Sequence, residues 1–207
     1  MQTNADPADC SAEVEHTFVP LSKVKNKVFE GTEEGDEGEQ AQTRVVLRVR
    51  AEPTEIAGFP VRVVEVRESE DGELVEQTLD YYSQCGDGSV FYVGEKVDDL
   101  EGGKVVGHGG QWQAGTDGAE AGLFMPADAK VGESFEQERA PGVAEDTSKV
   151  VAVDQKVEVP AGTFDGCIKT EDYAPLDKNT EFKFYCPDVG LVREEGEGFH
   201  SDLVRYG

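Results

Sequence analysis

Apolar and polar residues alternate over short stretches of the chain, and turn-forming residues separate these stretches. In residues 43–51, Val45, Leu47 and Val49 alternate with arginines, which is the pattern of a strand with one buried and one solvated face. Asp71-Gly72 then marks a tight hairpin turn between two longer alternating runs. The pattern therefore predicts β-strands joined by short turns along most of the chain.

The clearest hairpin lies in residues 157–192. Two strand-like runs, Phe164–Asp172 and Glu181–Cys186, flank a turn that is rich in Pro, Asp and Asn. Pro and Gly also punctuate the chain at Pro160 and Pro187, where the hairpin begins and ends. We therefore expect these two runs to be antiparallel neighbours.

Roughly ten to twelve such strands predict an all-β protein built from a single antiparallel meander. Because twist accumulates from strand to strand, the sheet is expected to curve strongly into a half-barrel or an up-and-down barrel. A two-sheet sandwich is the alternative. We divide the chain into a polar N-terminal segment, residues 1–15, and a single β domain, residues 16–207. A concave face lined by aromatic residues is the expected place for a ligand.

The chain is strongly acidic, because its 44 acidic residues outnumber its 19 basic residues and give a net charge of −25. Such a surface repels nucleic acid and anionic membranes, since their phosphates would meet carboxylates. It suits solubility, cation binding or a basic partner. No apolar run is long enough to span a bilayer. The polar start of the chain lacks the pattern of a signal peptide, so we expect that a leader has been removed from an exported protein.

The chain has four widely spaced cysteines and no Cys-x-x-Cys motif; the cysteines are Cys10, Cys85, Cys167 and Cys186. This spacing argues against a zinc knuckle or a thioredoxin-type motif and allows three disulfide pairings. The apolar, inward face is expected to carry Phe164 and Ile168 on one strand of the 157–192 hairpin and Phe182 and Phe184 on the other. Aligning these faces offsets Cys167 from Cys186 by one residue, which opposes a bond between them.

Cys85 and Cys186 both end predicted strands just before turns, so we expect these two residues to be bonded to each other. Cys10 then bonds Cys167, or both remain free. Four reduced thiols are the remaining alternative.

Motifs for chemistry are mostly missing from the sequence. The patterns of nucleophilic hydrolases and of phosphate-binding loops are absent. The three histidines, His16, His108 and His200, are far apart and share no strand or helix spacing, so we interpret them as exposed or structural. We predict no catalytic residue, no metal ligand and no cofactor, with calcium held by separate acidic loops kept as an alternative.

The most suggestive stretch is Asp80-Tyr-Tyr-Ser-Gln84, followed by Phe91-Tyr92. On an alternating strand Asp80, Tyr82 and Gln84 share one face of the sheet. That face is either a cross-strand aromatic ladder or the wall of a pocket. For the pocket hypothesis, the candidate ligand-binding residues are Asp80, Tyr82, Gln84, Tyr92, Trp112 and Tyr185.

A set of short motifs spans most of the chain from about Phe18 onward. They are Asp80-Tyr-Tyr-Ser-Gln, Asp87-Gly-Ser-Val-Phe-Tyr-Val-Gly-Glu95, Gly118-Ala with Met125-Pro-Ala, Val159-Pro-Ala-Gly-Thr-Phe164 with Cys167 and Lys169-Thr170, and Tyr185-Cys-Pro-Asp-Val-Gly-Leu-Val192. Together they resemble a family of uncharacterised bacterial exported β proteins, and some are similar to lipoprotein-carrier half-barrels. The resemblance implies a periplasmic or secreted β domain and brings no established activity.

Cys85 and Cys186 depart from that resemblance, since an acidic residue and a small residue are expected at these two positions. Their joint appearance favours the Cys85–Cys186 bond.

The function expected from the sequence is that of a non-catalytic exported binding domain. Its concave face would hold an apolar or amphipathic ligand, or another envelope protein. A cation-binding or structural envelope protein is the alternative. Less favoured is a hydrolase with carboxylates from distant strands, which predicts a polar cleft where two carboxylates perturb each other's pKa.

Overall fold

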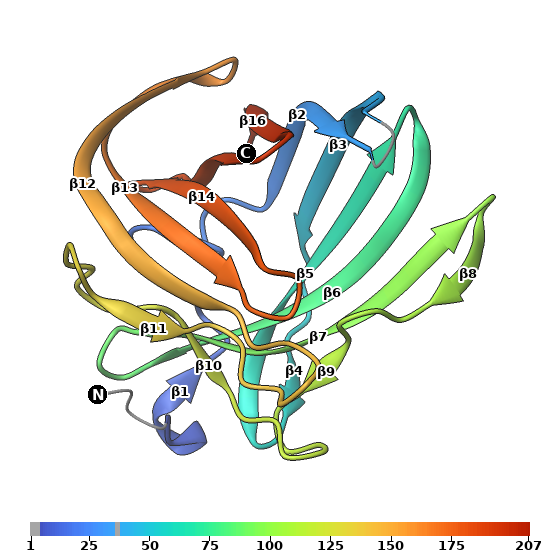
Figure 1. The fold of residues 1–207 in the computed structure, drawn as a ribbon. Coiled ribbons are helices and arrows are strands. Elements are labelled where there is room, and N and C mark those ends of the chain that lie inside the picture. The colour runs from blue at the N-terminus through green and yellow to red at the C-terminus, as the bar shows by residue number, and fades with distance from the viewer. Residues whose placement is uncertain (1–4, 36–37) are drawn as a thin grey trace.

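One antiparallel sheet accounts for most of the chain in the computed structural model, which describes residues 5–35 and 38–207 (Figure 1). A short 3-10 helix, η1 (Pro7–Asp9), is followed by the strands β1 (Cys10–Ser11), β2 (Asn26–Glu34), β3 (Gln40–Val49), β4 (Thr54–Ile56), β5 (Phe59–Glu70), β6 (Glu73–Cys85), β7 (Val90–Glu101), β8 (Lys104–Gly107), β9 (Trp112–Gln113), β10 (Gly122–Met125), β11 (Ser134–Glu136), β12 (Thr147–Val159), β13 (Gly162–Ala174), β14 (Asn179–Cys186), β15 (Gly190–Gly196) and β16 (Phe199–Tyr206). Asp71 and Gly72 join β5 to β6 with positive φ values of 49° and 88°, as a type I′ turn requires.

Twelve of the described strands form a continuous path in the order β10-β7-β6-β5-β3-β2-β16-β15-β14-β13-β12-β11. The four short strands β1, β4, β8 and β9 pair beside this path. The predicted all-β fold with a single antiparallel sheet is confirmed. The order departs from a simple meander at one place, where β16 pairs with β2 and joins the two halves of the chain.

The sheet curls until its two edges meet, with β10 beside β11 (Figure 1). A single bridge between Glu120 and Arg139 links the edges, and Glu120 N donates to Arg139 O at 2.9 Å. Gly122 permits this approach, because a Cβ at this position would lie 2.0 Å from the carbonyl oxygen of Gln137. No ladder joins β10 to β11 within the described residues, so the sheet is strongly curved and not closed into a barrel.

The described part of the N-terminal segment is joined to the sheet. β1 pairs with β6, and Cys10 forms a disulfide with Cys85. Val14 is fully buried and packs in a cluster with Val90 and Met125. Residues 1–4 of the segment predicted to be polar lie outside the described residues. From Cys10 onward, the segment contributes to the core of the domain.

The register of the β13–β14 hairpin corrects the predicted disulfide. Ile168 lies opposite Tyr185, so Cys167 and Cys186 lie side by side with a Cα–Cα distance of 4.1 Å and are bonded to each other. The predicted Cys85–Cys186 pair is therefore wrong, as are the free thiols and the Cys10–Cys167 bond.

The error comes from treating Phe182 and Phe184 as the inward face of β14. The inward side chains are Lys183 and Tyr185, which line the interior. Phe182 and Phe184 lie on the opposite face, where the Lys169 ammonium stands 4.0 Å and 4.8 Å from their ring centroids.

Two disulfides are typical of a protein in an oxidising compartment outside the cytosol. In residues 5–35 and 38–207, no helix is long and apolar enough to cross a membrane.

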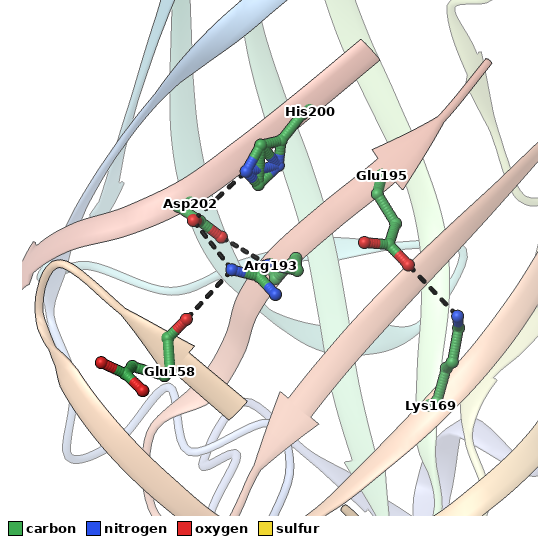
Figure 2. A network of polar contacts seen from close by, with 6 residues as sticks. All are labelled: Glu158, Lys169, Arg193, Glu195, His200 and Asp202. Atoms are coloured by element: carbon green, nitrogen blue, oxygen red, sulfur yellow. Dashed lines mark hydrogen bonds and ion pairs between the residues drawn. The ribbon is translucent and has the colours of Figure 1, made fainter. Parts of the chain in front are cut away.

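A polar network covers the outward face of β15 and β16 (Figure 2). Arg193 donates to both carboxylate oxygens of Asp202, at 2.6 Å and 2.9 Å, and to the carbonyl oxygen of Glu158 on β12 at 3.0 Å. His200 Nε2 lies 3.3 Å from the same Asp202 carboxylate. Because Arg193 reaches β12 and β16 from β15, the network holds the end of the long β12–β13 hairpin against the sheet.

We expect the loss of either disulfide to destabilise the protein, because each bond restricts the unfolded chain. The bonded residues are separated by 75 positions for Cys10–Cys85 and by 19 for Cys167–Cys186. The dependence on loop length predicts losses of about 4 and about 3 kcal/mol, respectively. Denaturant unfolding of the two paired Cys→Ser variants measures these losses. An unchanged midpoint, or a Cys85–Cys186 peptide in a non-reducing digest, would contradict this assignment.

Candidate functional site

The curled sheet surrounds a cavity of about 510 Å³. Part of its wall is apolar and comes from inward residues of β3 and β5, including Leu47, Val64 and Val66. Residues 18–21, which follow the N-terminal segment, also line it. The alternation of these strands explains the wall, because every second side chain of a strand points to the same face.

Aromatic rings from four parts of the chain form another part of the wall. Tyr82 on β6 lies opposite Tyr92 on β7, and their rings stack with centroids 5.0 Å apart. Phe124 on β10 meets Tyr82 edge-on at 4.9 Å, and Tyr185 on β14 meets Phe124 at 6.3 Å. The curl of the sheet brings β14 to β10, so aromatic residues far apart in sequence share one wall of the cavity.

Carboxylates stand directly beside these rings. Asp80 lines the cavity and accepts a hydrogen bond from the Thr78 hydroxyl at 2.6 Å. Glu95 lies opposite Asp80 in the β6–β7 ladder and accepts a hydrogen bond from the Tyr92 hydroxyl at 3.3 Å. Glu138, just beyond β11, also lines the cavity. The site is therefore a box of aromatic rings with an acidic side.

Burial raises the pKa of each of these three carboxyl groups. The pKa of Glu95 rises to about 9, because of burial and then the charges of Asp80 and Glu138. Burial raises the pKa of Glu138 to about 7, with a further contribution from Asp146, and that of Asp80 to about 6. No Lys, Arg or His in the described residues forms an ion pair with any of these three groups. Desolvation is therefore offset only in part, and mainly by hydrogen bonds.

Lys183 organises a second group of charges on the cavity wall. Its ammonium lies 3.5 Å from Asp172, 3.6 Å from Glu181 and 3.6 Å from Glu194. Burial lowers the pKa of Lys183, but these neighbouring carboxylates outweigh that effect and hold the pKa well above its usual range. The lysine therefore remains charged, and its charge is matched by its own neighbours.

Four of the six predicted ligand-binding residues, Asp80, Tyr82, Tyr92 and Tyr185, line the cavity together. The other two, Trp112 and Gln84, do not. Trp112 lies behind this wall, edge-on to Tyr92 at 5.6 Å, and borders a separate smaller hollow.

Gln84 does not line the cavity, and its side chain forms two hydrogen bonds with the backbone instead. Its side chain accepts from the backbone N–H of Glu15 at 2.7 Å and donates to the carbonyl oxygen of Gly88 at 2.9 Å. It holds the N-terminal segment to β6.

Sequence reasoning missed Glu138, Glu95, Phe124 and Lys183. Glu181, Lys183 and Tyr185 alternate along β14, and this polar alternation is the one signal that marks its inward face. Glu138 lies in an irregular acidic stretch where neither spacing nor composition indicates its position.

Calcium binding by separate acidic loops stays an alternative. In the described part of the chain, no group of three or more His, Cys, Asp and Glu side chains is arranged to hold a metal ion. No protein-family model, curated protein or solved structure matches this chain, so the geometry of the cavity carries the functional argument.

We expect the protein to lose stability as the pH rises from about 5 to about 8. Glu68, Asp80, Glu95 and Glu138 have pKa values raised by burial to about 7, 6, 9 and 7, so the folded state binds more protons than the unfolded state in this range. Burial lowers the pKa of Lys27 to about 7 and gives the opposite trend above that pH, where it comes to cancel the remaining contribution of Glu95 and ends the decline near pH 8. Melting temperatures measured across this range test the trend, and a rising temperature would contradict it.

Asp80→Asn is expected to stabilise the protein by about 1–2 kcal/mol near pH 8 and by about 1 kcal/mol less near pH 5, where most of the folded-state carboxyl is protonated. Asn keeps an oxygen that accepts the Thr78 hydrogen bond. Glu55→Gln on the exposed strand β4 is the matched control and should change stability little at either pH. Equal effects of the two substitutions would show that burial of Asp80 is not the cause.

Proposed function

We propose that this protein binds an amphipathic small molecule in the cavity of its curved sheet, without chemical conversion. The single observation that carries the proposal is the cavity of about 510 Å³, with an apolar wall on β3 and β5 and a polar aromatic box at Tyr82 and Tyr92. Small-molecule sites usually span about 300–1,000 Å³ and combine an apolar lining with a few polar groups that orient the ligand. An apolar body would lie against the valines, and its polar end would reach the box.

We further propose that it does so outside the cytosol, in the periplasm or as a secreted protein. Two disulfides support an oxidising compartment. The resemblance to exported β proteins supports the same location.

A second candidate function is acid–base hydrolysis in the same cavity. One observation favours it: Asp80 on the cavity wall lies opposite Glu95 in the β6–β7 ladder, and burial and then the charge of Asp80 raise the pKa of Glu95. Two carboxyl groups with separated pKa values are the arrangement that acid–base enzymes use. The two candidates differ in whether a bound molecule is released intact or cleaved.

The binding proposal is tested with phenylnaphthylamine, an uncharged fluorophore that brightens in apolar sites. We expect one molecule to bind per chain. Val66→Phe fills the apolar wall and should weaken binding about tenfold. Val106→Phe is the matched control, because Val106 is 63% exposed on β8, and it should bind as the unaltered protein does.

Mass spectrometry of the recovered probe and of a panel of glycosides and esters separates the two candidates. Intact recovery agrees with binding alone, whereas turnover that Asp80→Asn abolishes would support the hydrolase. Failure of the fluorophore to bind, or equal loss with Val66→Phe and Val106→Phe, would contradict the proposed site.

A further inference from the structure

We infer that the polar end of the ligand is an organic cation, a protonated amine or a quaternary ammonium group, held by Asp80 and Glu138 against the rings of Tyr82, Tyr92 and Phe124. This inference rests on the proposed function and identifies the class of ligand. It is drawn from the balance of charge in the cavity, from the rings and from one hydroxyl group that opens to the cavity.

The charge balance of the cavity strongly favours a positive ligand. Nine acidic side chains line the cavity and only three lysines do. Lys183 is surrounded by its own three carboxylates, and Lys27 donates to the carbonyl oxygen of Leu191 at 2.8 Å. Lys25 donates to the carbonyl oxygen of Leu21 at 2.7 Å. None of these lysines forms an ion pair with Asp80 or Glu138 within the described residues, so no direct ion pair neutralises the acidic side of the box.

The aromatic rings suit a cation for a separate reason. The face of an aromatic ring carries partial negative charge, and a desolvated cation over it gains about 2 kcal/mol. Tyr82, Tyr92 and Phe124 meet at centroid distances of 4.9–6.0 Å, so they form one compact group next to Asp80. Rings and carboxylates both attract a cation, whereas an anion would be repelled by both.

The hydroxyl of Tyr185 is a further polar group at the cavity wall that is open to a ligand. The residue is only 3% exposed and lines the cavity. Its oxygen is not one of the enclosed unpaired polar atoms, and within the described chain no hydrogen bond joins it to another group, so it opens to the cavity. Tyr185 is close enough to Tyr82 for its charge to raise the pKa of Tyr82, after burial and the charge of Asp80. After burial, the charges of Asp172 and Lys183 act most on the pKa of Tyr185 itself, so the hydroxyl lies between the box and the Lys183 group and offers an oxygen to an ammonium N–H.

Acidic groups from several elements act on this box, and each disfavours an anionic ligand. Besides burial, the charge of Glu76 raises the pKa of Asp80, and the charge of Asp146 raises the pKa of Glu138. Lys183 provides the opposing charge at Glu138 and lowers its pKa, but less than burial and Asp146 raise it. A bound cation would supply the positive charge that these carboxylates lack.

Three amphiphiles with the same alkyl chain test this inference: decyltrimethylammonium, decyl sulfate and decanol. Each is titrated against bound phenylnaphthylamine at low ionic strength and neutral pH. We expect the ammonium compound to displace the probe at a concentration about tenfold or more below that of the sulfate, with decanol between them. In Asp80→Asn/Glu138→Gln this preference should shrink to about twofold, while the affinity for decanol stays unchanged. Glu55→Gln, outside the cavity, should keep the full preference.

The outcomes separate the two proposals. Displacement by none of the three compounds would overturn the proposed function itself. Displacement by all three with no preference, or with a preference for the sulfate, would leave the binding function intact and overturn the cation. A preference that survives in the double variant would also overturn it. The comparison in the unaltered protein needs no variant, so it decides the inference even where the double variant does not fold.

Discussion

The pairing of β2 with β16 is the contact on which the rest of the structure depends. These strands come from opposite ends of the described chain and remain paired from Lys27–Tyr206 to Glu33–Phe199. Phe29 and Leu203 lie opposite each other in this ladder and are both almost completely buried. The ladder joins the half of the sheet that carries the β6–β7 carboxylates to the half that carries the β14–β15 charges. Without it neither half would enclose a cavity.

Charges inside the cavity show that its wall is not optimised for stability alone. Desolvation of a carboxylate is costly, and a protein recovers this cost when a cation or several hydrogen bonds stand close to it. The carboxylates around Lys183 have such a cation. Asp80, Glu95 and Glu138 do not, and they cluster beside the stacked tyrosines. Strongly perturbed carboxyl groups in a cavity are typical of functional sites, because such groups are unfavourable until something binds to them.

Much of the fold was predictable because alternation with period two is a direct consequence of strand geometry. The same rule brought Asp80 and Tyr82 to one face, and both line the cavity. It failed on β14, where apolar Phe182 and Phe184 were assigned to the inside. In a curved sheet with a polar cavity, the inward face carries Lys and Glu, so hydrophobicity no longer indicates which face is inside. The wrong face gave the wrong register, and the wrong register excluded the Cys167–Cys186 bond. Glu138 was not predictable, since its position depends on how far the sheet curls and not on any local pattern.

The position of Trp112 gives the protein an optical property of its own. It is the single tryptophan of the chain, it is 5% exposed, and its indole meets the ring of Tyr92 edge-on. Tyr92 in turn forms part of the cavity wall. A ligand that moved this ring would change the surroundings of the indole, so we expect the intrinsic fluorescence of the protein to respond when the cavity is filled, with no label attached.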